Sequence, residues 1–240
     1  MGLSVSKFAL YRAPRPTYSY YGLLNENNLR ALDRIFWYIK SNPKLGCLLS
    51  AIRKHDPATY LHSLNVLLIS MLIYQEMYSS AEYGPNFTLE LGLGSLFHDL
   101  GKMFIPGSVL NKPGKLTEEE LNLVQQHAQI GWAVIKRCRI PQAAAELVLR
   151  HHCYAHDLDT SYTDTLDPEL ISRIKIIGLA DAFDAMTSSR PYSVPKNLSE
   201  AYAEIVRCLG GQFDVVCGAS LLCIIKRLIK NSHATFSVCF

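Results

Sequence analysis

Five histidines and two aspartates in this sequence have the chemistry of metal ligands. They are His62, His98, Asp99, His127, His151, His152 and Asp181. A buried polar group is costly unless it has a partner, and a metal ion is such a partner for an imidazole or a carboxylate. The adjacent residues His98 and Asp99 can give one helix end both an imidazole and a carboxylate that bridges two ions. Mixed nitrogen and oxygen ligands suit iron, manganese, zinc or nickel better than calcium or magnesium.

Taken one at a time, these residues have simpler explanations. A lone histidine such as His127 is more often a hydrogen-bonded or surface residue than a ligand, and Asp99 before Leu100 and Gly101 can simply end a helix. These explanations weaken when seven such groups fall on five predicted helices, each near a helix end or on a polar face.

The elements that must position the first of these groups are predicted from apolar periodicity and caps. Apolar residues at three- and four-residue intervals predict a helix over 27–41. Asp56 followed by Pro57 predicts the start of a helix that carries His62 and runs to about residue 79. Thr88 is expected to cap a further helix that ends at His98 and Asp99, and Gly101 terminates it.

The remaining elements follow the same rules. The capping box that begins at Thr117 opens a helix expected to carry His127 on its polar side. Pro141 opens a helix that ends at His151 and His152, and Asp167 before Pro168 opens one through Asp181. Two more helices are expected over about 197–210 and 214–230. No pair of alternating apolar runs is joined by a hairpin turn, so the predicted fold class is all-α.

Composition narrows the class of protein. The chain has 240 residues, 49% hydrophobic and 19% charged, which excludes disorder for the bulk of it. The basic residues are scattered, so no nucleic-acid polymer is expected as a partner. The longest apolar stretch, residues 64–74, is shorter than the roughly 20 residues of a membrane-spanning helix, so no span is expected. Seven cysteines without a Cys-x-x-Cys motif favour the reducing cytoplasm.

Several separated motifs occur in the order typical of one enzyme family. They are Ser95 to Lys102, Ile105-Pro106, Leu110 to Glu120, His127 to Gly131, Ala180 to Tyr192 and Gly211 to Asp214. Over about residues 50–225 the chain resembles the HD-GYP branch of the HD-domain phosphohydrolases. The resemblance implies an HD-domain helical bundle with a five-helix metal-binding core and additional N- and C-terminal helices. It also implies an N-terminal arm and helix over 1–45, an HD-GYP-like phosphohydrolase domain over 46–230, and a tail over 231–240.

The resemblance implies roles for residues that match the family motifs. One divalent ion, iron or manganese, would be held by His62, His98, Asp99 and Asp181. The second would be held by the bridging Asp99 with His127, His151 and His152. Two-metal hydrolysis of a phosphate ester follows, with Asp99 and Lys102 as catalytic residues. Lys102 would also contact the scissile phosphate, Arg190 would grip a substrate phosphate, and Asp184 would lie at the pocket edge as a substrate-binding residue.

Three histidines and one loop depart from the ligand pattern. His55, His156 and His233 match no ligand position and are expected at the surface. The family follows its histidine pair with Glu, a basic residue and an Asp-Gly-x-Gly-Tyr-Pro loop, whereas residues 153–164 here lack the GYP signature. The change bears on substrate recognition and on partner binding through that loop. A third-metal carboxylate of some members aligns with Arg53, so two ions are expected.

Three functions remain open from the sequence. The first is a metal-dependent phosphodiesterase that converts cyclic di-GMP to the linear dinucleotide or GMP. The second is an HD phosphohydrolase that acts on another nucleotide or phosphate ester, which the altered loop favours. The third is a catalytically silent module that binds a cyclic dinucleotide or another protein. The first 45 residues either pack against the core or mediate a homodimer.

Overall fold

The computed structural model describes residues 20–78, 84–158, 166–188 and 194–236 of the chain. These residues are helical apart from turns and one isolated bridge between Leu209 and Phe213, which confirms the predicted all-α class. The elements are η1 (Tyr20–Leu23), α2 (Glu26–Ser41), α3 (Pro43–His55), α4 (Pro57–Met77), α5 (Pro85–Phe97), η2 (Leu100–Phe104), α6 (Gly107–Leu110), α7 (Glu118–Gln125), α8 (His127–Ile135), α9 (Gln142–Arg150), α10 (Ala155–Leu158), α11 (Pro168–Thr187), α12 (Leu198–Cys208) and α13 (Val215–Phe236).

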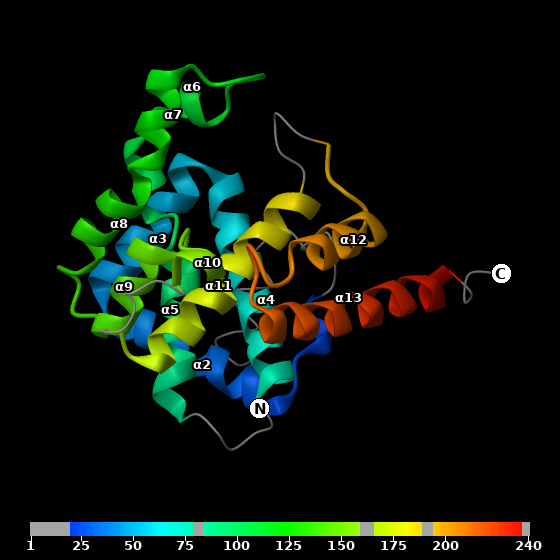
Figure 1. Cartoon of the computed structure of the whole chain (residues 1–240). Coiled ribbons are helices and arrows are strands. Elements are labelled where there is room, and N and C mark those ends of the chain that lie inside the picture. The colour runs from blue at the N-terminus through cyan, green and yellow to red at the C-terminus, as the bar shows by residue number, and fades with distance from the viewer. Residues whose placement is uncertain (1–19, 79–83, 159–165, 189–193, 237–240) are drawn as a thin grey trace.

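Helix α4 is the centre of the bundle, and α5, α11 and α13 pack around it (Figure 1). Its side chains are apolar on almost every face, which is the pattern of a helix surrounded by protein. By length and composition alone, this helix could cross a membrane. However, 72% of its most apolar 18-residue stretch is buried inside the protein. This burial is that of a core helix.

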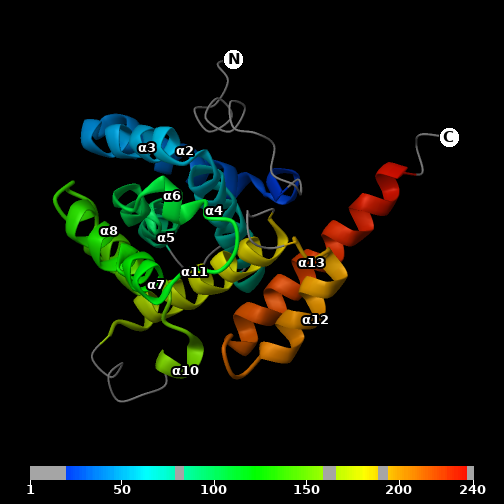
Figure 2. The same cartoon turned by 90° about the horizontal axis from the view of Figure 1, so that it is seen from above.

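Helix α11 crosses the middle of the molecule in the view from above (Figure 2). Helices α7 and α8 lie on one side of it, and the antiparallel pair of α12 and α13 lies on the other. Asp181 and Asp184, in the C-terminal half of α11, contact His62 of α4.

One glycine brings η2 and α8 into direct backbone contact. A Cβ added to Gly101 would lie 1.9 Å from the His127 carbonyl oxygen and 2.8 Å from the Gly131 nitrogen. Only glycine allows this approach. The contact fixes Asp99, two residues before Gly101, against the first turn of α8.

Two helix starts differ from the sequence-based prediction. Helix α5 begins at Pro85 and not at Thr88, because proline is pre-organised for the first helical position. The Thr88 hydroxyl lies inside the helix and donates to the Pro85 carbonyl over 3.2 Å. Helix α3 was not predicted from the sequence; its signals are Pro43 at its start and the buried residues Leu45 and Ile52.

The helix predicted to begin at the Thr117 capping box is divided in two. The capping box itself is present, but α7 ends at Gln125 and α8 begins at His127. The Val124 carbonyl accepts a hydrogen bond from the His127 ring over 2.6 Å, which turns this histidine inward. His127 is 3% exposed, so its expected place on a polar helix face is wrong.

Candidate metal centre

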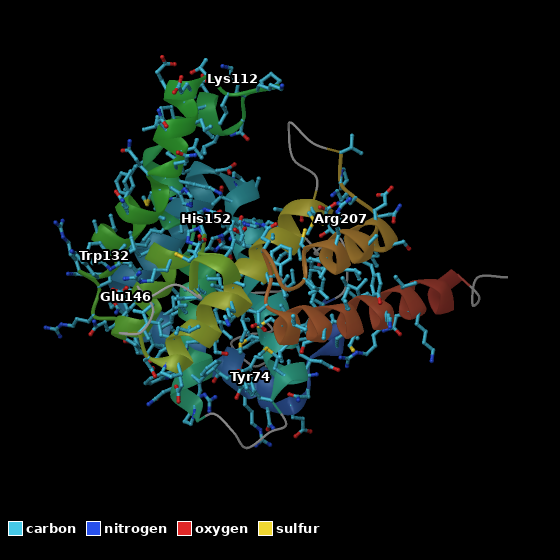
Figure 3. All side chains as sticks on the ribbon, in the orientation of Figure 1. Tyr74, Lys112, Trp132, Glu146, His152 and Arg207 are labelled. Carbon is cyan, nitrogen blue, oxygen red and sulfur yellow. The ribbon has the colours of Figure 1, made fainter. Side chains whose placement is uncertain are left out.

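Five helical segments deliver the seven expected ligand side chains to one place. His62 comes from the second turn of α4, His98 and Asp99 join α5 to η2, and His127 begins α8. His151 and His152 follow α9, and Asp181 lies in α11. His152 marks the cluster at the centre of the molecule in Figure 3. Three overlapping groups drawn from these seven residues have the proximity of a metal site.

The first half-site consists of His62, His98 and Asp181 around Oδ2 of Asp99. Nε2 of His62 lies 2.9 Å from Oδ1 of Asp181 and 3.3 Å from Nε2 of His98. Oδ2 of Asp99 lies 3.5 Å from Nε2 of His62 and 3.3 Å from Nε2 of His98. Ligand atoms that are each about 2.0–2.2 Å from one ion are separated by about 3 Å, so these atoms enclose a space for one ion.

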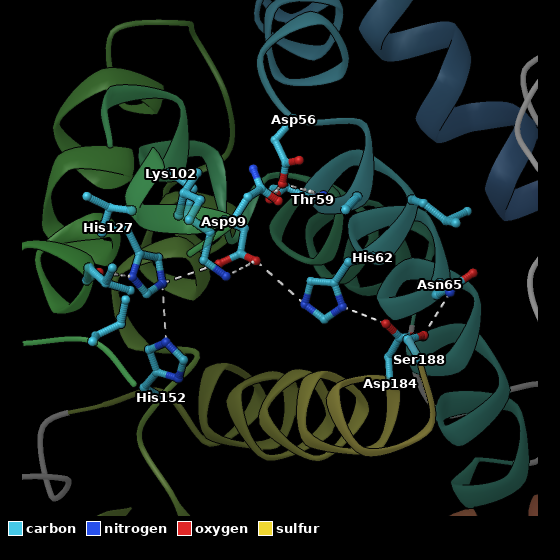
Figure 4. A pocket seen from close by; sticks show the side chains of 17 residues that line it. Asp56, Thr59, His62, Asn65, Asp99, Lys102, His127, His152, Asp184 and Ser188 are labelled. Atoms are coloured by element: carbon cyan, nitrogen blue, oxygen red, sulfur yellow. Dashed lines mark hydrogen bonds and ion pairs between the residues drawn. The ribbon is translucent and has the colours of Figure 1, made fainter. Parts of the chain in front are cut away.

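The second half-site consists of His127, His151 and His152 around the other oxygen of Asp99. Nε2 of His127 lies 3.3 Å from Oδ1 of Asp99. The same nitrogen lies 3.2 Å from Nε2 of His151 and 3.2 Å from Nε2 of His152. Asp99 therefore directs one carboxylate oxygen to each half-site, as Figure 4 shows from the side of the pocket.

Three of the histidines are held by the backbone of the helical turn that precedes them in the chain. Nδ1–H of His98, His127 and His151 donates to the carbonyl three residues earlier, over 2.8, 2.6 and 2.9 Å. A carbonyl can only accept, so Nδ1 carries the proton of each neutral ring and Nε2 presents a lone pair to the site. Hydrogen bonds of this kind orient metal-binding histidines.

His62 is held by a side chain instead. Its Nδ1–H donates to Oδ2 of Asp184 over 2.6 Å. The other oxygen of Asp184 accepts from Asn65 over 2.8 Å and from the Ser188 hydroxyl over 2.9 Å. The Asp184 side chain is only 1% exposed but lines the pocket, as expected, and its carboxylate supports His62. A role in substrate binding stays a prediction.

Carboxylates dominate the electrostatics of the first half-site. Burial disfavours the charged form of His62, but hydrogen bonds to Asp181 and Asp184 outweigh burial and raise its pKa to about 9. Burial acts to raise the pKa of Asp181, but the hydrogen bond and charge of His62 hold it below its usual range. In the metal-free protein a proton on His62 therefore offsets part of the negative charge.

Burial dominates the second half-site. It lowers the pKa of His127 to about 4, and the positive charge of Lys102 adds to the effect. Burial holds the pKa of His151 well below its usual range, and the adjacent imidazoles of His98 and His152 add to the effect. Burial also lowers the pKa of His152. All three rings are neutral at pH 7 and offer lone pairs.

The second half-site contains buried acceptor atoms that no donor in the described part of the chain satisfies and that a cation would satisfy. Oδ1 of Asp99 is buried and has no hydrogen-bond partner among the described residues. Nε2 of His127, 3.3 Å from Oδ1, and Nε2 of His151 beside it carry no proton, because Nδ1 holds the proton of each ring. Lone pairs about 3.2 Å apart repel one another. A divalent ion between them would satisfy all three atoms, so these residues fit a bound metal.

The cluster opens into a pocket of about 360 Å³. Lys102 lies in its wall and donates to Oδ2 of Asp99 over 2.6 Å. Burial acts to raise the pKa of Asp99, but His98, Lys102 and His62 outweigh it and hold that pKa well below its usual range. Part of the lining is aliphatic and comes from the segment around α6, with Val109, Leu110 and Leu116.

Several expected residues lie apart from the centre or outside the described residues. Arg190 falls outside them, as do residues 159–165 of the loop that lacks the GYP signature. His55 is exposed, as expected, and its Nε2 is hydrogen-bonded to the Ile105 carbonyl over 2.9 Å. The side chains of His156 and His233 are not among those described.

Comparison with known proteins shows the family to which the chain belongs. A family model described as an HD domain matches residues 59–215. The chain belongs to the HD domain family. A cyclic di-GMP phosphodiesterase of Pseudomonas aeruginosa is 34% identical to this HD domain protein over 184 residues, which cover 76% of this chain and 43% of the relative. A cyclic di-GMP phosphodiesterase of Thermotoga maritima is 38% identical over 152 residues, covering 62% and 40%.

A solved structure supports the HD fold. An HDG"Y"P protein from Bdellovibrio bacteriovorus superposes with a TM-score of 0.56 at 19% identity, covering 92% of this chain and 68% of that one. The resemblance inferred from the motifs is thus confirmed for both family and fold. This HD domain protein spans less than half the length of the curated relatives it matches.

Proposed function

We propose that this chain is a metal-dependent phosphodiesterase that hydrolyses cyclic di-GMP to the linear dinucleotide or to GMP. The observation that carries the proposal is the position of Asp99, which directs one oxygen to each half-site beside an open pocket. The similarity to cyclic di-GMP phosphodiesterases supports the choice of substrate.

The ligand set supports two divalent ions, for which we propose iron or manganese. His62, His98, Asp99 and Asp181 would hold one, and Asp99 with His127, His151 and His152 would hold the other. When bound, the ions supply Lewis-acid polarisation of the phosphoryl group and an activated water.

The protein side chains around the ions supply positioning and charge. Lys102 holds its ammonium group beside Asp99 in the pocket wall, where it can stabilise the charge that develops on the phosphate or protonate the leaving oxygen. Asp184 fixes the ring of His62. Val109, Leu110 and Leu116 add an aliphatic surface to the pocket lining.

The proposal is tested with protein purified without oxygen and loaded with iron or manganese. Cyclic di-GMP should be hydrolysed, and His98→Ala should abolish turnover together with metal binding, because it removes a ligand of the first half-site. His55→Ala is the matched control, since this exposed histidine belongs to neither half-site and should leave metal content unchanged.

Two outcomes separate the alternatives. Faster hydrolysis of phosphomonoesters or other nucleotides than of cyclic di-GMP would mean that the site serves another substrate. Tight binding of cyclic di-GMP without turnover, in protein shown to contain both ions, would make the chain a silent binding module and reject the proposed activity.

A further inference from the structure

A group of positive charges gathers where the α2–α3 junction meets the α8–α9 turn. We name this group the basic corner; its members are Lys40, Lys44, Lys136, Arg137 and Arg139. It is invisible in the sequence, because its two parts are about 93 positions apart. Lys40 lies in the last turn of α2 and Lys44 in the first turn of α3, whereas the other three follow α8.

Hydrogen bonds hold the two parts of the basic corner together. The carbonyls of residues 137–139 accept, in order, from Lys44, Asn42 and Tyr38 over 3.5, 2.6 and 2.8 Å. The turn also holds Arg139 at φ = 49°, in the left-handed region that non-glycine residues rarely adopt. The cations are therefore presented by a braced turn and not by a loose loop.

The charges of the basic corner are exposed and unpaired. None of its five cations has a carboxylate within 4.0 Å in the described ranges of the chain, and all five are exposed to solvent. Some cations elsewhere are paired: Lys196 contacts Glu204, and Arg227 contacts Glu76. The ammonium group of Lys136 lies 3.6 Å from the ring centre of Trp132, which is labelled at the edge of the molecule in Figure 3. This contact leaves the positive charge of Lys136 in place.

An exposed indole adjoins these charges. Trp37 is 64% exposed, and it lies one helical turn before Lys40 on the solvent face of α2. That face also carries the exposed residues Arg30 and Arg34. An exposed apolar ring with one polar N–H next to exposed cations matches the headgroup region of a bilayer, where tryptophan is enriched and phosphates are abundant.

The basic corner faces away from the pocket. His127 begins α8 and His151 follows α9, whereas the corner lies at the opposite ends of both helices. Helix α3 likewise runs from Lys44 at the corner to His55, which contacts the segment that lines the pocket. In the view from above, the ends of α2, α3 and α8 lie together at the edge of the molecule (Figure 2).

We propose that the basic corner docks this protein on an anionic lipid surface, with its lysines and arginines on phosphate headgroups and the Trp37 indole in the interface. A flat bilayer can reach an edge formed by helix ends, and the pocket stays open to solvent. The proposal is independent of the activity of the metal centre.

The first test is sedimentation of the full chain with phosphatidylcholine vesicles that contain or lack phosphatidylglycerol. Binding should require the anionic lipid and weaken as sodium chloride is added. Lys44→Glu combined with Arg137→Glu should lower partitioning at least about twentyfold, because each cation near the surface contributes about fivefold. The control, Lys54→Glu with Lys230→Glu, changes net charge equally at exposed sites outside the corner and should stay within about threefold of the parent.

The second test reads Trp37 directly. The sequence contains two tryptophans, so Trp132→Phe leaves Trp37 as the sole indole, and its emission should shift to shorter wavelength on anionic vesicles. Circular dichroism checks that each variant folds. Equal binding by the two double variants, or no emission shift, overturns the proposal. Binding of an RNA oligonucleotide at the corner without vesicle binding also overturns it, in favour of a nucleic-acid surface.

Discussion

The two half-sites share the Asp99 carboxylate, but opposite electrostatic effects act on their histidines. In the first, His62 is surrounded by Asp181 and Asp184, and its pKa is raised to about 9. In the second, His127 is buried with other neutral rings, and its pKa is lowered to about 4. The first half-site therefore exchanges a proton for an ion, whereas the second has no proton to release at pH 7 when an ion binds. One cluster can thus contain two sites with different metal affinities and different pH dependence.

The largest predicted effect comes from removing the element that the half-sites share. Asp99→Asn should lower turnover of cyclic di-GMP at least about a thousandfold, because the several kcal/mol of stabilisation that the ions provide would be lost. Elemental analysis should show a deficit at both half-sites. Retention of one full ion would show that the half-sites are independent and that Asp99 does not bridge them.

The next effect should separate the half-sites. Asp184→Asn replaces the acceptor of the His62 Nδ1–H with a neutral amide, and loss of such a support typically lowers metal affinity about 10–100-fold. Titration with manganese should show the loss in one binding step only. Equal weakening of both steps would mean that Asp184 acts through general stability.

The two half-sites should also differ in how their metal affinity depends on pH. At pH 6–8 the first ion must displace the proton of His62, so its apparent affinity should rise about tenfold per pH unit. The second half-site should show no such slope, because His127 is already neutral above about pH 4. Calorimetry in buffers of different ionisation enthalpy should detect about one proton released in one step and none in the other.

The stability of the metal-free protein should follow the same pKa values. The raised pKa of His62 stabilises the fold fully below about pH 6.5, and this contribution should be lost as the pH rises through about 9. Thermal unfolding of the metal-free protein in that range should show the loss. Asp184→Asn should reduce it, since Asp184 is one of its causes.

The smallest predicted effect tests the outer support of the first half-site. Ser188→Ala removes one of the hydrogen bonds that Asp184 accepts and leaves those from His62 and Asn65. Manganese affinity at the first half-site should fall only about threefold, the size of one net hydrogen bond. A loss as large as that of Asp184→Asn would show that Ser188 orients the whole cluster.

Features set by neighbouring residues could be predicted from the sequence, whereas contacts between residues far apart in the chain mostly could not. Caps and prolines predicted the starts of α4 and α11 nearly to the residue, because these signals act within one turn. The seven candidate ligands were visible as residue types in ordered motifs. The support of His62 by Asp184 spans 122 positions, and no local rule connects them. The basic corner was missed for the same reason.

The carbonyl groups that hold His98, His127 and His151 have a consequence for how this centre tolerates mutation. A backbone carbonyl is present whatever side chain its residue carries, so substitutions at Ser95, Val124 or Val148 leave the anchor in place. The anchor of His62 is encoded in a side chain, and a single codon change at Asp184 removes it. As related sequences diverge, the first half-site, which contains His62, should therefore be lost before the second half-site with His127, His151 and His152.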